Sequence, residues 1–299
     1  MTYSIVARDP ETGELGVAVQ SMYFHVGPVV PWAEAGVGAV ATQSLVNVAF
    51  GPLGLDLMRG GMSAPQALAA VVAGDSEPDG RQCAMVDAGG GVAAHSGPRC
   101  IPAAGHRLGD GYSCQANLME RDTVWDAMAA AYESTAGRPL AERMVEALRA
   151  AEAEGGDIRG RQSATLLLVT GQPTGRAWED RLMDLRVEDH PDPVAELARL
   201  VRLERAHAAA QGAARALLLG DDATYRARAL EALSIAPEQA QVRVSAGLMH
   251  ARAGEWEEAR RLLRSVIEEE PRWREALRRM AAVERLPPGL VAEIEHQLL

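Results

Sequence analysis

Two strand-like runs at the start of the chain constrain its fold more than any other feature. They are Thr2-Tyr-Ser-Ile-Val-Ala7 and Leu15-Gly-Val-Ala-Val-Gln-Ser21, separated by the turn residues Asp9-Pro-Glu-Thr-Gly13. Proline and glycine supply the fixed and the positive φ angles that such a turn needs. The second run is small and apolar enough to be covered on both faces. The chain is therefore expected to begin with a buried β-hairpin.

The residues after this hairpin alternate strands with helices. Ser63, Pro65 and Gln66 form a capping box with proline in the first turn, which marks the start of a helix. Strands grouped around paired helices predict an α+β fold in which sheets are sandwiched between helices. The expected strands cover residues 36–43, 83–87, 92–95, 163–169 and 182–187, and the other expected helices cover residues 52–59, 123–133 and 140–154.

The chain changes character at about Pro193 and becomes rich in Ala, Leu, Glu and Arg, which predicts helices. Gly220 and Gly254 stand 34 residues apart, as do Pro237 and Pro271, and this spacing is that of the tetratricopeptide repeat. We therefore expect two domains, residues 1–200 and residues 201–299.

Two repeats are fewer than the three that such an array usually needs for stability. The tail is therefore expected to lean on the main domain or on another subunit. Trp256 and Trp273 offer a contact for a homodimer.

Composition excludes several classes of function. The net charge of -11, with no basic stripe, argues against a nucleic-acid or anionic-membrane surface. No apolar run is long enough to cross a bilayer and no signal peptide is present, so a cytoplasmic location is expected. The scattered histidines and the three cysteines have no metal-binding spacing, and no cofactor is expected. Every basic residue is arginine, which excludes a lysine base or Schiff base.

Thr2 is the first residue to consider as a catalytic centre. If Met1 is removed, as a small following side chain permits, Thr2 carries both a hydroxyl group and a free α-amine. An N-terminal amine titrates near pH 8, so it accepts a proton from a neighbouring hydroxyl at neutral pH. Threonine paired with its own amine is an established type of activated nucleophile. A threonine at position 2 is common in proteins without catalysis, and only its place on a buried strand favours this hypothesis.

Several strings of the sequence together resemble the DUF1028 family over about residues 2–200. The resemblance implies a four-layer αββα sandwich of the N-terminal nucleophile (Ntn) hydrolase superfamily and hydrolysis of amide bonds. The strings are Thr2-Tyr-Ser-Ile-Val-Ala-Arg-Asp-Pro-Glu-Thr-Gly13, Gly16-Val-Ala-Val-Gln-Ser21, Val29-Val-Pro-Trp-Ala33, Gly36-Val-Gly-Ala-Val-Ala-Thr-Gln43, Gly160-Arg-Gln-Ser-Ala164 and Asp184-Leu-Arg-Val-Glu-Asp-His-Pro-Asp-Pro193.

The resemblance assigns Thr2 as the nucleophile and its α-amine as the general base. The proteasome-like branch adds an aspartate at the end of the second strand and a lysine nearby. This chain has Gln20 and Ser21 at the end of that strand and contains no lysine. Other polar residues at expected strand ends must then tune the amine. The catalytic candidates beside Thr2 are Ser21, Gln43 and Asn117, and the candidates for substrate binding are His25, Asp157 and Arg161.

Asn117 is our choice for the donor that stabilises an oxyanion, although a cap or turn role fits it equally well. A hydrogen bond within the sheet would equally explain Ser21. Asp157 and Arg161 also fit a purely structural ion pair, and an arginine beside the amine would lower its pKa through like-charge repulsion.

Two functions from different classes fit the sequence. The first is an Ntn-type amidohydrolase that cleaves a small amide or peptide through Thr2. The second is a non-catalytic scaffold whose tetratricopeptide-like tail binds a protein partner or forms a dimer, since the aspartate and lysine are missing.

Overall fold

The computed structural model describes residues 2–283, 286 and 289–298. Contacts divide the chain into two compact units, Met1–Val201 and Arg202–Leu299. The boundary falls within helix α6, which spans Pro193–Leu219. None of the helices in the described ranges combines the length and the apolar character needed to cross a bilayer.

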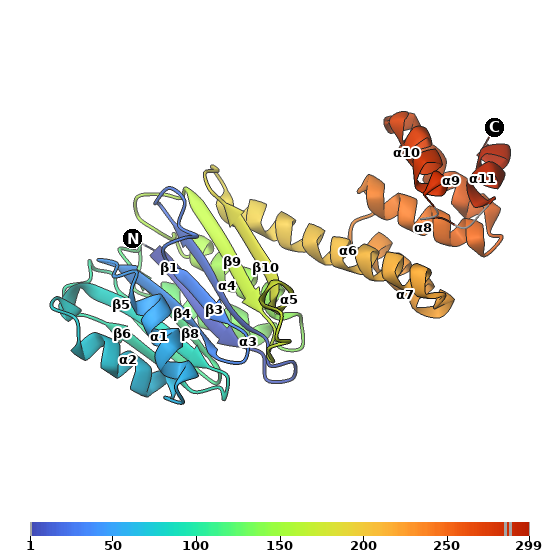
Figure 1. Cartoon of the computed structure of the whole chain (residues 1–299). Helices are drawn as coiled ribbons and strands as arrows, with labels where there is room; N and C mark the ends of the chain where they lie inside the picture. Colours follow the sequence, from blue (N-terminus) through green and yellow to red (C-terminus); the bar gives the residue numbers. More distant parts are fainter. Residues whose placement is uncertain (1, 284–285, 287–288, 299) are drawn as a thin grey trace. The chain divides into compact units, whose positions relative to one another are not determined.

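The first unit contains a six-stranded antiparallel sheet in the order β10-β9-β2-β1-β8-β7 (Figure 1). Strands β1 and β2 pair as a hairpin, which confirms the expected N-terminal hairpin. The strands are β1 (Thr2–Arg8), β2 (Leu15–Ser21), β7 (Gly105–Gly109), β8 (Tyr112–Asn117), β9 (Ser163–Val169) and β10 (Arg181–Val187).

A four-stranded antiparallel sheet, in the order β3-β4-β5-β6, faces the first sheet. Its strands are β3 (Pro31–Glu34), β4 (Gly38–Ser44), β5 (Arg81–Asp87) and β6 (Val92–Ser96). Val6 and Val19 of the larger sheet and Ala41 and Val86 of the smaller sheet are buried in one apolar cluster between them. These side chains are small, which allows the two sheets to approach closely.

Each sheet carries a pair of helices on its outer face. Helices α1 (Phe50–Arg59) and α2 (Ala64–Ala73) pack on the smaller sheet, and α3 (Val124–Ser134) and α4 (Leu140–Ala153) pack on the larger one. The short helices η1 (Pro78–Gly80) and α5 (Ala177–Asp180) lie in connecting segments.

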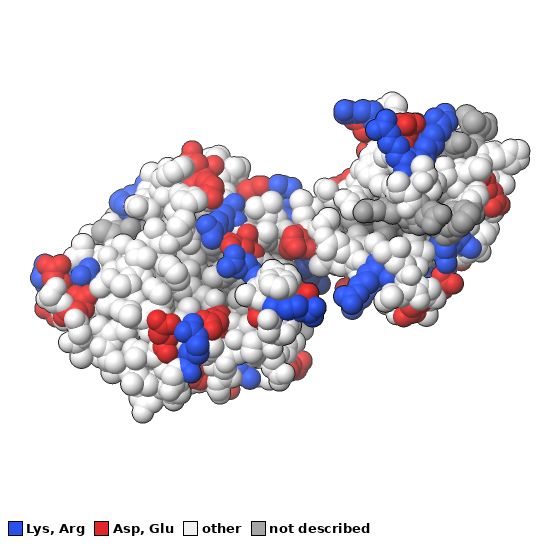
Figure 2. All heavy atoms as spheres, in the orientation of Figure 1, with Lys and Arg blue, Asp and Glu red and all other residues white. Residues whose placement is uncertain are grey.

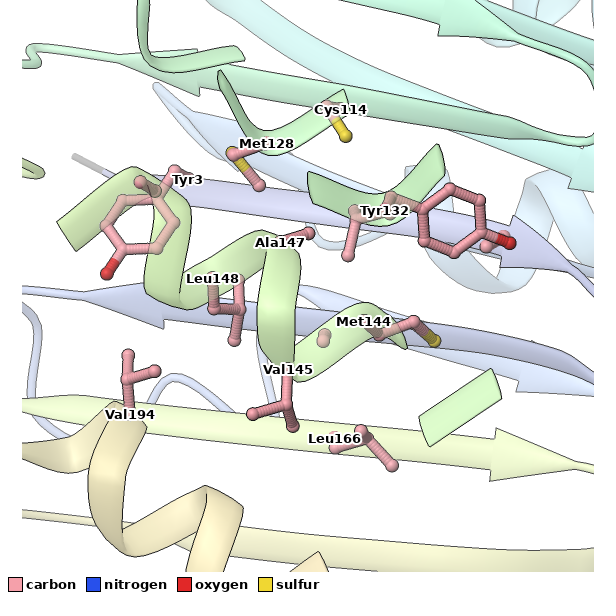
Figure 3. Close-up of a cluster of buried hydrophobic side chains, with 14 of the residues drawn as sticks. Tyr3, Cys114, Met128, Tyr132, Met144, Val145, Ala147, Leu148, Leu166 and Val194 are labelled. Carbon is pink, nitrogen blue, oxygen red and sulfur yellow. The ribbon is translucent and has the colours of Figure 1, made fainter. Parts of the chain in front are cut away.

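The core under α3 and α4 explains why the first strand is buried on both faces. Tyr3 points from β1 toward α4, where Leu148 and Val145 belong to the same cluster as Leu166 of β9 (Figure 3). Burying a large apolar side chain contributes about 1.5–3 kcal/mol. Odd-numbered residues of β1 thus pack against helices, and the even-numbered residues Thr2, Ser4 and Val6 face the second sheet.

Two structural features were missing from the sequence-based prediction. Residues 31–34 form strand β3, and residues 105–117 form the hairpin β7–β8, which places β8 beside β1. The turn between β7 and β8 contains Asp110-Gly111, with Gly111 at a φ of 70°, and this dipeptide is a strong hairpin signal. The strand expected over residues 83–87 pairs with β6 as predicted.

The second unit is helical. Gly220 and Gly254 follow α6 and α8 closely with φ values of 74° and 73°, which ends each helix at a conformation that glycine accepts readily. Trp256 and Trp273 are partly buried against the apolar cluster of this unit itself. Besides the C-terminal part of α6, its helices are α7 (Asp222–Ile235), α8 (Ala240–Arg252), α9 (Trp256–Glu269), α10 (Arg272–Ala282) and α11 (Leu290–Leu298).

Candidate functional site

Thr2 lies at the beginning of β1, between Ser21 of β2 and Asn117 of β8. Its side chain faces the second sheet, and the residue is only 5% exposed. The hydroxyl oxygens Oγ1 of Thr2 and Oγ of Ser21 lie 3.0 Å apart, within hydrogen-bonding distance. The fold therefore holds the Thr2 hydroxyl against a second hydroxyl in a nearly water-free position.

Two side-chain amides converge on the main-chain carbonyl of Thr2. Gln43 Nε2 donates to this oxygen at 3.3 Å and Asn117 Nδ2 donates at 3.4 Å. Both nitrogens also donate to Gln82 Oε1, each at 2.7 Å. Three strands, β4, β5 and β8, thus each supply an amide that fixes the start of β1.

Further buried polar groups extend this arrangement along the space between the sheets. Ser4 Oγ donates to Gln43 Oε1 at 2.6 Å and accepts from Gln115 Nε2 at 2.7 Å. Gln82 Nε2 donates to the carbonyl of Ala116 at 2.8 Å. We call Ser4, Gln43, Gln82, Gln115 and Asn117 the amide network. Buried networks of this kind are strong in a medium of low dielectric constant and costly to break.

One acceptor of the amide network is left over. Asn117 Oδ1 is buried and has no hydrogen-bond partner within the described part of the chain. A buried unpaired acceptor costs about 1–3 kcal/mol, so an unpaired amide oxygen next to Thr2 calls for an explanation.

Asp157 contacts the segment that follows Ser21 and pairs with an arginine. Its carboxylate accepts from the backbone N–H of Met22 at 3.4 Å and pairs with Arg159 at 2.7 Å. Its side chain is fully buried. The structure therefore gives Asp157 a clear role in holding the segment after β2, next to Ser21.

Arg161 pairs with residues other than Asp157, so the alternative of an ion pair between these two residues is wrong. Arg161 Nη1 instead lies 3.1 Å from Glu152 and 3.6 Å from Asp192. The Tyr3 hydroxyl donates to the same Glu152, and burial together with this carboxylate raises the pKa of Tyr3 well above its usual value. Tyr3 and Glu152 belong to the helix-covered side of the sheet, and Thr2 faces the other side.

His25 follows β2 in a strained conformation, with a φ of 61°. Its ring pairs with Glu188, and its backbone N–H donates to the carbonyl of Glu188 at 3.2 Å. The contacts recorded for His25 thus fasten the loop after β2 to the segment after β10.

Ser44 and Leu118 share this rare backbone conformation, with φ values of 69° and 58°. Ser44 ends β4 directly after Gln43, and Leu118 directly follows Asn117. Such strain collects at functional sites, because the surrounding structure must hold it in place. Here it occurs beside two residues that contact Thr2.

Metal and thiol chemistry find little support at this site. Within the described ranges, no group of three or more His, Cys, Asp or Glu side chains is placed to hold a metal ion. Cys83 and Cys114 are buried, and burial raises the pKa of both thiols, which makes them poor nucleophiles.

The sequence analysis did not identify Gln82, Ser4 or Gln115 as part of the site. A signal was present: Ser113, Gln115 and Asn117 alternate with apolar residues, as do Thr2 and Ser4. A strand with period-two polar residues that is buried on both faces must pair those residues with other buried polar groups. The sequence around Gln82 shows no such pattern. Its place in the site becomes clear only from its contacts with Gln43 and Asn117.

The fold and site define a mixed α+β protein with two antiparallel sheets and a helical C-terminal region. The model of DUF1028, described as a family of unknown function, matches residues 2–197. The chain therefore belongs to the DUF1028 family.

A solved structure is similar to the same part of the chain. It is the crystal structure of a DUF1028 protein from Silicibacter pomeroyi, which is 28% identical and superimposes with a TM-score of 0.60. The match covers 67% of this chain and 88% of that chain. No curated protein matches the chain.

Proposed function

We propose that the first unit is an amide hydrolase of the Ntn type, with an αββα sandwich and Thr2 as its nucleophile. The observation that carries this proposal is the position of Thr2, whose Oγ1 lies 3.0 Å from Ser21 Oγ at the buried start of β1. The amide network immobilises the main chain at this residue. A nucleophile held rigidly in a dry position has already lost the conformational freedom that an attack requires.

The reaction follows from the chemistry of an N-terminal threonine. Thr2 Oγ1 attacks the substrate carbonyl, and the hydroxyl proton passes to the α-amine of Thr2. The protonated amine then donates this proton to the leaving nitrogen, the amide C–N bond breaks, and an ester to Thr2 remains. Water, deprotonated by the amine, hydrolyses the ester and restores the hydroxyl. This route requires removal of Met1, a residue that lies outside the described residues.

In this proposal, burial of Thr2 among neutral hydrogen-bonding groups lowers the pKa of its α-amine, which is the effect that a nearby lysine would otherwise have. Burial disfavours the charged form of an amine and lowers its pKa. The side chains that hydrogen-bond to Thr2 are the hydroxyl of Ser21 and the amides of Gln43 and Asn117, none of which carries a charge, and the nearby carboxylate of Asp157 is neutralised by its pair with Arg159. The α-amine is therefore expected to be free base at neutral pH without help from a neighbouring cation.

Asn117 has two atoms that serve this mechanism. Its unpaired Oδ1 accepts a hydrogen bond from the α-amine of Thr2 once Met1 is removed. Its Nδ2 donates one hydrogen to Gln82 Oε1 at 2.7 Å and the other, over a long 3.4 Å, to the carbonyl of Thr2. We propose that this second hydrogen is the one that stabilises the oxyanion. Asn117→Asp keeps the acceptor for the α-amine and removes the donor for the oxyanion, whereas Asn117→Ala removes both. Comparison of the two variants therefore separates the two roles.

The experiment uses variants that alter the amine and the hydroxyl separately. A β-lactone acylates reactive threonines, and intact-mass spectrometry with peptide mapping locates the adduct. We expect labelling of Thr2 in the wild type, retained labelling in Thr2→Ser and none in Thr2→Ala. An alanine inserted between Met1 and Thr2 keeps the hydroxyl and displaces the amine, and it is expected to abolish labelling. Equal labelling in the insertion variant would exclude the amine as base.

A second candidate function rests on the tail, which we propose to be tetratricopeptide-like and to bind a protein partner or a second copy of the chain. Its supporting observation is Gly247, where a Cβ atom would lie 2.7 Å from Leu263 Cγ, so that α8 and α9 pack closely. A cleft of about 170 Å³ between α7 and α8 is lined by Tyr225, Arg226 and Met249, among others. The measurement is the effect of each variant on the cellular phenotype of a deletion of this chain. Full rescue by Thr2→Ala and failed rescue by Arg226→Ala would favour this function over hydrolysis.

A further inference from the structure

The loops at the Thr2 end of the sheets expose large apolar side chains. Tyr23 and Phe24 after β2 are 56% and 62% exposed, and Ile158 before β9 is 56% exposed. Singly exposed apolar residues are common, but a contiguous group marks a binding surface. The apolar rim, as we call this group, consists of Met22, Tyr23, Phe24, Leu45, Ile101 and Ile158.

Each loop of the apolar rim begins at, or bonds to, a residue next to Thr2. Met22 follows Ser21, and Leu45 follows Gln43 by two residues. The backbone N–H of Leu118, next to Asn117, donates to the carbonyl of Ile101 at 3.0 Å. The N–H of Ile158 donates to the carbonyl of Leu118 at 3.3 Å. The loops that carry the rim residues are therefore joined directly to the residues that contact Thr2.

Polar contacts beneath the rim hold these loops in place. Ser163 Oγ donates to the carbonyl of Tyr23 at 2.7 Å and accepts from the N–H of Val26 at 3.1 Å. Arg81 Nη1 donates to the carbonyl of Leu45 at 2.6 Å. The apolar side chains are thus presented to solvent by an anchored main chain, and this is an arrangement expected of a preformed binding surface.

Several of the charged groups near the rim are paired with one another. Asp157 pairs with Arg159, His25 with Glu188, and Arg81 with Asp75. Beside the N-terminal end of β1 in Figure 1, Figure 2 shows a wide area of residues without charge, with basic residues at its border. A charged substituent on a substrate would lose hydration at this surface. It would gain no compensating ion pair, because the charged groups named above are already paired with one another.

We propose that this site takes neutral amides that carry an apolar aliphatic or aromatic substituent, which the rim covers while the amide carbonyl lies at Thr2. This inference deepens the proposed hydrolase and rests on it for the reaction. The recognition step stands apart from the reaction, so binding and chemistry are tested separately.

Hexanamide and adipamic acid are a matched pair of probes, since they share the amide group and a chain of the same length and differ by a terminal carboxylate. Their binding to the wild-type chain and to Thr2→Ala is measured by isothermal titration calorimetry at pH 7. We expect hexanamide to bind at least about tenfold more tightly. Phe24→Ser and Ile158→Ser are each expected to weaken hexanamide about fivefold or more, because each removes apolar contact area.

Trp178→Ser provides the matched control. Trp178 is 77% exposed, but α5 follows Val169, which pairs with Leu15 at the opposite end of the sheet from Thr2. This variant is expected to leave hexanamide binding unchanged. Thermal melting tests whether each variant is folded. If a rim variant is not folded, Tyr23→Ser is used in its place.

The outcomes separate the two proposals. Selective hexanamide binding without any lactone adduct on Thr2 would overturn the hydrolase and leave the apolar site standing. Equal binding of the two probes, a preference for adipamic acid, or no binding of hexanamide would overturn the apolar site. Sedimentation velocity adds one more test: a dimer that Phe24→Ser dissociates would assign the rim to contact between copies and overturn substrate recognition.

Discussion

The hydroxyl oxygens of Thr2 and Ser21 lie 3.0 Å apart across the paired strands β1 and β2. Ser21 thus stands at the end of β2, on the Thr2 side of the sheet. Gln20, one residue earlier, lies opposite Tyr3 and so faces the helices. A neutral hydroxyl in this place orients the Thr2 hydroxyl without adding a charge.

Ser21→Ala tests this orienting role. Loss of one hydrogen bond of about 1 kcal/mol is expected to slow lactone labelling of Thr2 about fivefold, with little change in thermal stability. The rate is followed by intact-mass spectrometry over time. Ser134→Ala, at an exposed helix position, is the matched control. An unchanged labelling rate in Ser21→Ala would remove Ser21 from the site.

Gln82 joins the amides of Gln43 and Asn117 through one oxygen atom. Gln82→Ala leaves two buried donors short of a partner, and a cost on the order of 3 kcal/mol in the free energy of unfolding is expected. Urea denaturation followed by circular dichroism measures this cost. Gln172→Ala, on an exposed loop, is expected to change stability by less than about 0.5 kcal/mol. Similar small effects for both variants would show that the amide network is not structural.

Asp75 gives the fold a defined response to acid. Hydrogen bonds from Asn47 and Arg81 lower the pKa of Asp75 to about 2. Because the folded pKa lies below the unfolded value, the stabilisation is present above about pH 4 and is lost as the pH falls toward 2. Asp75→Asn is therefore expected to be less stable than wild type at pH 7, by on the order of 2 kcal/mol.

Urea denaturation at pH 7, 4 and 2 checks this prediction. The difference between wild type and Asp75→Asn should shrink at pH 2, where the wild-type carboxylate is half protonated. Because Arg81, which pairs with Asp75, also donates to the carbonyl of Leu45, the variant is expected to weaken hexanamide binding. A stability difference that stays constant across this pH range would contradict the assigned pKa shift.

Close packing of α8 on α9 makes Gly247 sensitive to any side chain. Gly247→Ala places a Cβ atom 2.7 Å from Leu263 Cγ, and overpacking of this kind costs about 1–3 kcal/mol. Gly212→Ala on α6 meets its nearest atom at 3.7 Å and is expected to be neutral or stabilising, since alanine favours helices. Thermal unfolding of the full chain compares the two. Equal effects would place the close contact of α8 with α9 in doubt.

The sequence predicts well what depends on neighbouring residues. The hairpin of residues 2–21 is predicted correctly because its strand residues and turn residues are adjacent in the sequence. The sequence marks Asn117 only as a polar residue near an expected strand end. Its contact with Thr2 cannot be predicted without knowing that β8 pairs with β1.

Long-range pairing explains the rest. One of the two neighbours of β1 is β8, more than 100 residues away, and the Asp110-Gly111 turn signal alone does not say which strand β8 joins. Gln82 belongs to the site only because β5 faces β8 across the two sheets. The ion pairs of Arg161 with Glu152 and Asp192 likewise depend on how α4 and the segment after β10 meet.

The most direct test of the account is the state of residue 2 in the purified native protein. Intact-mass spectrometry is expected to show a chain that has lost the mass of one methionine. After treatment with the β-lactone, a single adduct is expected on the peptide that begins with Thr2. A native chain that keeps Met1, or an adduct on any other residue, would contradict the claim that Thr2 and its own amine form the catalytic centre.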